Sequence, residues 1–298
     1  MREFRFTVTK EDEGLGVKKL IRRHFDFSSR LFAKLKAQER ITLNGEVLRG
    51  WMVPKEGDVV IARLPDEKSG FEPEDIPVIP VYEDQDILVI DKPPGYTVHP
   101  TKGHPCHTMA NGIMKYMLET GQDFKIRFAN RLDMDTSGLL VIAKNSHAQD
   151  EIIRQMDAGS FVKKYKALVF GELIEDDFVI DKPIGQSDPT KVGREVMTDG
   201  TGKDSVTVVH VSERFRGYTL VELELKTGRT HQIRVHLSHI GHPIVGDPLY
   251  GGESPLLPRQ ALHAYYLNFS HPAEDRELEL TSEIPEDIQN AIAAIKEE

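Results

Sequence analysis

A stretch without periodicity at residues 66–80 divides the chain into two unequal parts. Its sequence, DEKSGFEPEDIPVIP, mixes prolines, a glycine and charges and repeats with neither a helical nor a strand period, which is typical of a linker. A chain of 298 residues is long enough for two domains at about 150 residues each. We therefore predict a small domain at residues 1–68, a linker at 69–80 and a larger domain at 81–298.

The composition is that of a folded protein in a reducing compartment. Hydrophobic residues make up 39% and charged residues 29% of the chain, so both domains can bury a core. The single cysteine, Cys106, excludes an internal disulfide and a cysteine-rich zinc site. The first residues lack the apolar core of a signal peptide, and no apolar run is long enough for a membrane span. We expect a cytoplasmic protein that does not contact membranes.

The net charge of −10 is unevenly distributed along the chain. Basic residues exceed acidic ones by 4 within residues 1–68, whereas acidic residues exceed basic ones by 7 within 271–298. A surface that binds phosphate groups needs local positive potential, not a basic total. The negative net charge therefore does not exclude a nucleic-acid partner.

The small domain has the pattern of two helices followed by a hairpin. Residues 15–25 carry an apolar stripe, and Ser28 or Ser29 is placed to cap a second helix whose other face is basic. The Asn44-Gly45 pair favours a tight turn before a β-rich run at 58–64. The basic face could simply be a solvated helix surface. However, residues 28–64, with Ser-Arg, I-x-x-N-G and G-D-x-V, resemble the small RNA-binding domain (alpha-L type) first known from a small-subunit ribosomal protein. That resemblance implies that Arg30 and Lys34 contact RNA phosphates.

The large domain alternates strands and helices and indicates an α+β fold. Short apolar runs at 87–90, 138–143 and 164–170 predict strands, and Thr108 is placed to cap a helix that extends to about residue 118. Residues 146–156 predict another helix. Segments 205–213 and 218–226 predict a hairpin, and 230–240 a helix that ends at Gly241.

The run Arg131-Leu-Asp-Met-Asp-Thr-Ser-Gly138 places polar groups at the edge of the predicted core. An aspartate surrounded there by hydroxyl and backbone N–H donors could act as a nucleophile or a base. The alternative is a capping aspartate in a tight turn.

Two further segments could contribute to the same site. In Thr227–His236, Arg229 lies where a guanidinium can bind a carboxylate with two hydrogen bonds, although an exposed arginine at a helix start is common. Tyr165, among lysines at a strand start, could stack on a base or simply pack. The turn at 246–251 is expected to border the site without supplying a reactive group.

The histidines do not predict a metal site. The residues involved are His99, His104, Cys106 and His107 in one segment, and His231, His236, His239 and His242 in the other. The first set lies in a Pro/Gly loop without paired spacing, and the second lacks the i, i+4 spacing of H-E-x-x-H. We expect no metal and no cofactor.

Three motifs together resemble the RluA-type pseudouridine synthases. They are R-L-D-x-x-T-S-G-L-L-V-x-A-K at 131–144, K-x-Y-x-A-x-V-x-G at 163–171, and T-G-R-T-H-Q-I-R-V-H-L at 227–237, which is followed by G-x-P-I-x-G-D-x-x-Y-G at 241–251. The resemblance covers nearly all of residues 80–270. It implies a mixed, mainly antiparallel sheet with flanking helices and a central cleft, and conversion of uridine to pseudouridine in RNA.

The resemblance also implies a role for each site residue. Asp133 would be the catalytic aspartate, Arg229 its ion-pair partner, Tyr165 the aromatic residue against the target base and Ile233 an apolar wall. Arg131 would contact the substrate. The family commonly has His directly before Arg-Leu-Asp, where this chain has Asn130. Whether the carboxylate attacks the sugar or removes a sugar proton is open, since both need an ionised oxygen near the anomeric carbon.

Two other functions compete with this interpretation. Asp133-Met-Asp-Thr fits the D-x-D-x-T pattern of magnesium-dependent phosphatases, but the buried strand follows the motif instead of preceding it. A non-catalytic RNA-binding protein is the second alternative. We expect a monomer that modifies RNA, with ribosomal RNA as the first candidate substrate and transfer RNA as the second.

Overall fold

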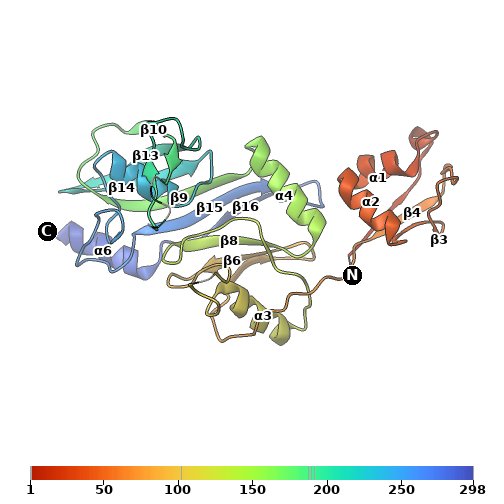
Figure 1. Ribbon diagram of the computed structural model, residues 1–298, viewed down its shortest axis with the longest axis horizontal. Coiled ribbons are helices and arrows are strands. Elements are labelled where there is room, and N and C mark those ends of the chain that lie inside the picture. Colours follow the sequence, from red (N-terminus) through yellow and green to blue (C-terminus); the bar gives the residue numbers. More distant parts are fainter. Residues whose placement is uncertain (1, 102, 187, 189, 191, 298) are drawn as a thin grey trace.

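Two units of different size follow each other along the chain in the computed structural model, which describes residues 2–101, 103–186, 188, 190 and 192–297 (Figure 1). The smaller unit lies at one end of the molecule, and residues 64–79, which form neither helix nor strand, connect it to the larger one. Among the described residues, no helix is both long and apolar enough to cross a bilayer.

The small unit packs two helices on a four-stranded sheet of order β1-β4-β2-β3. The predicted helices and the hairpin are present, and the Ser28 hydroxyl caps α2 by accepting a hydrogen bond from the backbone N–H of Leu31 at 3.2 Å. Asn44 and Gly45 both have positive φ, as a tight hairpin turn requires. Strand β1 was not predicted. The elements are β1 (Glu3–Thr7), a 3-10 turn (Lys10–Asp12), α1 (Val17–Phe25), α2 (Ser29–Ala37), β2 (Ile41–Leu43), β3 (Glu46–Val47) and β4 (Val59–Arg63).

The large unit is built on a ten-stranded sheet of order β10-β13-β14-β9-β15-β8-β6-β5, with β16 beside β15 and β7 beside β8. The β15–β8 pair is parallel and the other described neighbours are antiparallel, which confirms the predicted α+β class with a mixed, mainly antiparallel sheet. The elements are β5 (Pro80–Glu83), β6 (Ile87–Lys92), α3 (Met109–Thr120), β7 (Arg127–Phe128), β8 (Ser137–Ala143), α4 (Ser146–Ala158), β9 (Val162–Phe170), β10 (Asp177–Asp181), β11 (Ile184–Gly185), β12 (Glu195–Val196), β13 (Val206–Phe215), β14 (Tyr218–Leu225), α5 (Gln232–His239), β15 (Leu262–Ser270), β16 (Glu277–Thr281) and α6 (Glu286–Glu297).

Strand β8 is the centre of the core, with all seven residues buried. Leu140 packs in the core that includes α3, and Leu139 in the core that includes α4, because successive side chains point to opposite faces of a strand. Gly138 has φ +113°, and a Cβ there would lie 2.3 Å from the carbonyl oxygen of Ala264. Glycine is therefore required for β15 to approach β8 at the point where the polar run ends.

The acidic C-terminal segment is part of the large unit. Strand β16 pairs with β15, and α6 places Ile288, Ala291 and Ile295 in the main core. Its acidic residues lie largely on the other faces, where they are solvated. The charge excess at 271–298 is thus a property of an amphipathic helix and an edge strand.

The two units meet through a small aromatic contact. His147, on α4, packs against Phe4 and Phe27 of the small unit, with ring centroids 5.2 Å and 4.9 Å apart. Burial lowers the pKa of His147 to about 4, so this imidazole is neutral at pH 7. Beside it, the Arg2 guanidinium lies 2.9 Å from the Asp86 carboxylate. These contacts hold the small unit next to α4 (Figure 1).

Candidate active site

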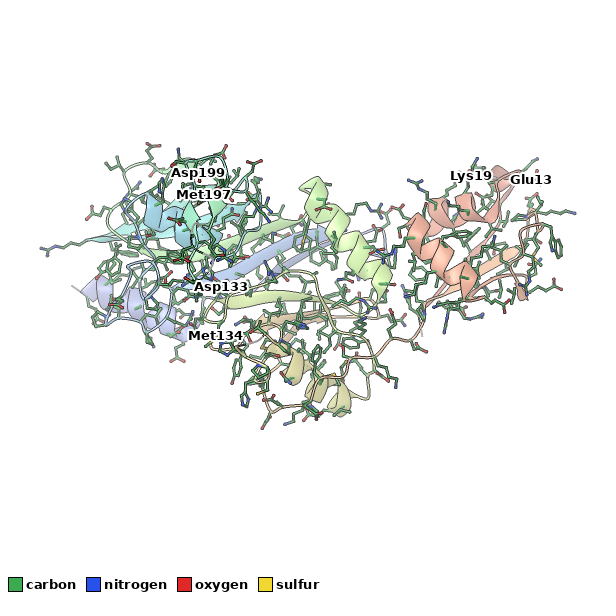
Figure 2. The ribbon with its side chains drawn as sticks, in the orientation of Figure 1. Glu13, Lys19, Asp133, Met134, Met197 and Asp199 are labelled. Atoms are coloured by element: carbon green, nitrogen blue, oxygen red, sulfur yellow. The ribbon has the colours of Figure 1, made fainter. Side chains whose placement is uncertain are left out.

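A cleft of about 740 Å³ opens in the large unit where the β7–β8 connection, β9 and the start of α5 come together. It lies near the middle of this unit, where Figure 2 marks Asp133. Five of the predicted site residues line it: Arg131, Asp133, Tyr165, Arg229 and Ile233. Three sequence motifs separated by many residues therefore share one cavity.

The loop that carries Asp133 is held by its backbone. Three consecutive carbonyl oxygens accept hydrogen bonds: that of Asp133 from the Thr136 N–H at 3.1 Å, that of Met134 from the Lys92 ammonium at 2.8 Å, and that of Asp135 from the Arg259 guanidinium at 3.0 Å. Lys92 is fully buried, and burial lowers its pKa to about 7. Fixing the backbone in this way leaves the Asp133 carboxylate, 26% exposed, at the wall of the cleft.

Arg234 supplies the cation beside this carboxylate. Its Nη1 donates to Asp133 Oδ2 at 3.0 Å, while Nε and Nη2 donate to the two carboxylate oxygens of Asp247 at 2.7 Å and 2.9 Å. Burial opposes the charged form, but the two carboxylates raise the pKa of Arg234 above its ordinary value. The ring of Tyr250 covers the guanidinium at 5.0 Å. A bidentate pair to buried Asp247 thus orients the group that binds Asp133.

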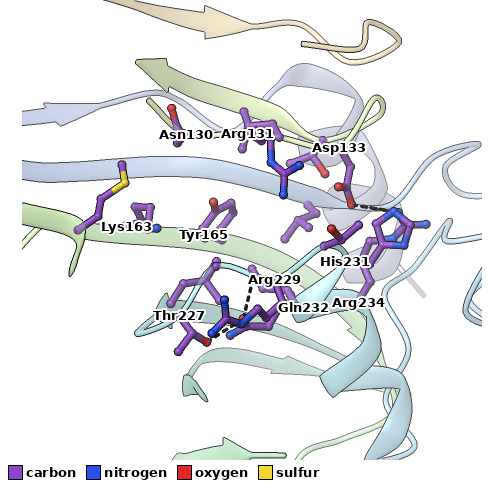
Figure 3. A pocket seen from close by; sticks show the side chains of 18 of the residues that line it. Asn130, Arg131, Asp133, Lys163, Tyr165, Thr227, Arg229, His231, Gln232 and Arg234 are labelled. Carbon is purple, nitrogen blue, oxygen red and sulfur yellow. Dashed lines mark hydrogen bonds and ion pairs between the residues drawn. The ribbon is translucent and has the colours of Figure 1, made fainter. Parts of the chain in front are cut away.

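The predicted ion pair between Asp133 and Arg229 is wrong. The Arg229 Nε donates to the backbone carbonyl of Asp204 at 3.1 Å, and its side chain lies by Gln232, away from Asp133 (Figure 3). Arg229 precedes α5, whereas Arg234 lies within its first turn, on the face toward the Asp133 loop. The rotation of α5 about its own axis determines which of the two arginines faces Asp133.

The sequence around Arg234 contains a pattern from which this residue could have been identified. Arg234 lies between Ile233 and Val235, and every residue from 232 to 237 is buried. A charged residue inside such a segment needs a carboxylate partner. Asp247, in the turn at 246–251, is that partner and is itself completely buried. No described residue of this turn lines the cleft itself; the turn supports the site through the hydrogen bond from Arg234 to Asp247, a role that was not predicted.

Tyr165 and Ile233 form an apolar wall of the cleft, and both are less than 7% exposed. Burial raises the pKa of Tyr165, and the negative charge of Asp133 raises it further, so the phenol keeps its proton at neutral pH. No described residue exchanges a hydrogen bond with its hydroxyl, which is therefore available to a ligand. A flat, apolar wall beside a carboxylate suits a planar base attached to a sugar.

Asn130 has a structural role at the position where His was the expected residue. Its side-chain amide donates to the carbonyl of Leu139 at 3.1 Å and accepts from the N–H of Val141 at 2.8 Å. The Asn130 side chain therefore bonds to the backbone of β8 as a residue of a neighbouring strand would. These bonds hold the start of the 131–138 segment against the core.

Three cations in the cleft have no carboxylate partner among the described residues: Arg131, Lys163 and Arg229, whose Nε donates to a backbone carbonyl. Arg131 is exposed, and Lys163 lines the cleft at the start of β9, where burial lowers its pKa. Unpaired cations around a cavity favour an anionic ligand. Arg30 and Lys34 lie outside the cleft on α2, and the Lys34 ammonium is 3.3 Å from the Glu67 carboxylate.

Within the described residues, one group of carboxylate and imidazole side chains is compact enough to hold a metal ion: Asp84, Asp86 and His271, outside the cleft. His271 lies 2.6 Å from Asp84, and Arg2 lies 2.9 Å from Asp86, so a hydrogen bond and an ion pair already account for the grouping. None of the histidines considered in the sequence belongs to it.

Comparison with known proteins identifies the family of the large unit. A family model described as RNA pseudouridylate synthase matches residues 86–239. The chain is 39% identical over 264 residues, 86% of each chain, to "Uncharacterized RNA pseudouridine synthase YlyB" of Bacillus subtilis (strain 168). It is 37% identical over 274 residues, 87% of this chain and 85% of the relative, to "Ribosomal large subunit pseudouridine synthase D" of Pseudomonas aeruginosa.

A solved structure, "Human RNA Pseudouridylate Synthase Domain Containing 1", has the same fold. It superposes with a TM-score of 0.60 at 28% identity, and the match covers 72% of this chain and 86% of that one. The family model matches more than half of the sequence, and the relatives extend the similarity over most of its length. The chain therefore belongs to the RluA-type RNA pseudouridylate synthases, which isomerise uridine in RNA.

Proposed function

We propose that this pseudouridine synthase uses Asp133 as its catalytic carboxylate and acts on ribosomal RNA of the large subunit. The observation that carries the catalytic assignment is the position of Asp133. Its carboxylate is bound by Arg234 at 3.0 Å in a cleft that also presents Tyr165 and Ile233. The substrate assignment is supported by the name of the Pseudomonas relative, which is a ribosomal large subunit enzyme.

The reaction needs few groups because substrate and product are isomers. The bond from the sugar C1′ to uracil N1 breaks, the uracil turns, and C1′ bonds to C5 instead. The hydrogen on C5 leaves to solvent and N1 gains one, so atoms and electrons balance without an oxidant. The protein has to supply an anionic oxygen near the sugar, a countercharge that holds it, and walls that keep the detached base in place.

Each requirement has a candidate residue in the cleft. The Asp133 carboxylate supplies the oxygen, and Arg234, anchored by Asp247, supplies the countercharge. Tyr165 and Ile233 can confine the uracil between a ring face and an aliphatic side chain. Arg131 and Lys163 can bind the phosphates that flank the nucleotide. A uridine has to leave its stack to enter this cleft, which favours loops and bulges of folded RNA.

The small unit is proposed to bind RNA through the basic face of α2. Arg30 is exposed and has no described partner, so its guanidinium is free to contact a phosphate. Replacing Arg30 by Ala should weaken RNA binding and lower the slope of log affinity against log salt concentration by about 1, because one phosphate contact is lost.

Lys19 provides the matched control for Arg30. It is an exposed cation on α1, the other helix of the small unit (Figure 2). Lys19→Ala removes the same charge and should leave the salt slope unchanged. Equal slopes for the Arg30 and Lys19 variants, measured by filter binding at several salt concentrations, would contradict a phosphate contact at Arg30.

Tritium release tests the proposed activity and substrate directly. Large-subunit ribosomal RNA, small-subunit ribosomal RNA and transfer RNA are transcribed with tritium at uracil C5 and incubated with the purified chain. We expect tritium in the solvent from the large-subunit RNA alone. Release only from transfer RNA would overturn the substrate but not the chemistry, and no release from any RNA would count against both.

A further inference from the structure

His231 occupies a costly backbone position immediately before α5. Its φ of 58° and ψ of 19° lie in the left-handed region, which costs an L-residue with a Cβ about 1–2 kcal/mol and which Asn or Gly adopts more readily. Its side chain is only 12% exposed and lies against the Asp133 carboxylate. An observed backbone outlier at a catalytic cleft is a reason to look for a role of the side chain.

A short chain of hydrogen bonds favours one tautomer of the His231 ring. The backbone N–H of Arg194 donates to the Tyr250 hydroxyl oxygen at 2.8 Å, and this oxygen lies 2.8 Å from His231 Nδ1. Since the phenol accepts from Arg194, its own proton can be donated to Nδ1. Burial lowers the pKa of His231, although Asp133 opposes this effect, and Arg234 and Arg194 add to it. The neutral ring with Nδ1 as acceptor carries its hydrogen on Nε2.

The Nε2–H of His231 faces the same carboxylate oxygen that Arg234 binds. The distance from Nε2 to Asp133 Oδ2 is 3.8 Å, and that from Arg234 Nη1 to Oδ2 is 3.0 Å (Figure 3). No described residue donates a hydrogen bond to Asp133 Oδ1. The two oxygens of the carboxylate are therefore not equivalent: Oδ2 accepts from Arg234 and lies 3.8 Å from His231 Nε2, whereas Oδ1 accepts no hydrogen bond from a described residue.

We propose that His231, with its tautomer set by Tyr250, is a positioning residue that holds Asp133 Oδ2 together with Arg234 and leaves Oδ1 as the oxygen that reacts with the target nucleoside. This inference rests on the proposed catalytic role of Asp133. It assigns to His231 a task that the Arg234 pair cannot perform alone, because one hydrogen bond leaves the carboxylate free to rotate about its Cβ–Cγ bond. The Nε2–H of His231, at 3.8 Å, is beyond hydrogen-bond distance, but its electrostatic attraction for the same oxygen opposes that rotation.

Two amide variants distinguish a positioning role of the His231 side chain from a purely conformational role of its backbone. The two roles predict opposite orders of kcat for His231→Gln and His231→Asn. The amide nitrogen of Gln can take the place of Nε2, whereas that of Asn takes the place of Nδ1. Asn, however, tolerates the left-handed backbone better than Gln. We expect His231→Gln to stay within about threefold of wild-type kcat and His231→Asn to lose about tenfold to a hundredfold, as expected for a misplaced catalytic group, with KM unchanged in both. A His231→Asn variant that is as active as His231→Gln, or more active, would overturn the proposal.

Tyr250→Phe tests the tautomer without touching the imidazole. The Phe ring still packs over Arg234, but Nδ1 loses its donor. We expect a several-fold lower kcat in the wild-type background and no further loss in His231→Gln, because an amide has no tautomer to set. Equal losses in the two backgrounds would contradict the role of Tyr250.

A spectroscopic readout keeps the inference testable apart from activity. In the full chain labelled with ¹⁵N-histidine, the His231 signals at neutral pH should be those of the Nε2–H tautomer, and Tyr250→Phe should move them toward a mixture. An Nδ1–H tautomer in the wild-type protein would overturn the proposal even if a variant fails to fold. If Asp133→Asn keeps full turnover, the proposed function fails instead, whatever tautomer His231 has.

Discussion

Replacing Asp133 by Asn is expected to abolish pseudouridine formation while the fold and RNA binding remain. The amide has nearly the same shape as the carboxylate but offers no ionised oxygen, so it can neither attack the sugar nor accept a proton from it. We expect a loss on the order of 10⁴-fold, the upper end of what a single acid–base group contributes. The side chain is 26% exposed, and Arg234 keeps both hydrogen bonds to Asp247, so the stability should change little.

Tritium release from C5-labelled RNA measures this loss, and thermal unfolding and filter binding confirm that the variant is folded and binds RNA. Asp135→Asn is the matched control. Asp135 lies in the same loop, its side chain accepts no hydrogen bond from a described residue, and its backbone carbonyl keeps the contact with Arg259. We expect nearly normal activity in that variant. Turnover by Asp133→Asn would refute the catalytic assignment. If both aspartates prove essential and activity requires magnesium, the result would instead favour the phosphatase pattern D-x-D-x-T.

Arg234→Leu is expected to have the largest effect on stability and to lower activity as well. Asp247 is completely buried, and without Arg234 the donors left to its charge among the described residues are the backbone N–H groups of Leu249 and Tyr250. Removing one partner of a buried ion pair costs about 3–5 kcal/mol. The Asp133 carboxylate loses its only direct guanidinium contact in the described structure, so kcat should fall by about a hundredfold or more.

Urea unfolding and tritium release separate the two effects of this substitution. Adding Asp247→Asn to Arg234→Leu should recover part of the stability, because no buried charge is left unpaired, but should not restore turnover. Arg229→Leu is the control, since Arg229 lines the same cleft and its guanidinium donates, within the described part of the chain, to a backbone carbonyl and not to a carboxylate. A larger activity loss from Arg229→Leu than from Arg234→Leu would favour the pairing predicted from sequence over the one in the structure.

Local sequence patterns were sufficient for most elements of the fold. The run Gly-Leu-Leu-Val-Ile-Ala at 138–143 is apolar at every position, and β8 is indeed buried on both faces. Thr108 and Ser28 precede α3 and α2, as predicted from their capping hydroxyls. Strand β1 escaped prediction because Glu3–Thr7 is a short edge strand, and its pairing with β4 depends on residues nearly sixty positions later.

The residues of the candidate site were likewise only partly predictable from local sequence patterns. Asp133, Tyr165, Ile233 and Arg131 could be named from the sequence because they stand in three motifs of recognisable chemistry, and the cleft brings them together. The partner of Asp133 could not be named in this way. Arg229 and Arg234 lie five residues apart in one motif, and each has a guanidinium long enough to reach a carboxylate.

Residue types and their spacing predicted by themselves many of the strands and helices, and they singled out the segment that carries the candidate carboxylate. Hydrophobic period and capping act within a few residues and can be read directly. Only the tertiary structure decided that Arg234 faces Asp133 across a separation of 101 residues and that Asp247 anchors it. That pairing depends on how α5 is rotated and packed, and the packing is the joint result of the core and of a buried charge that has to be compensated.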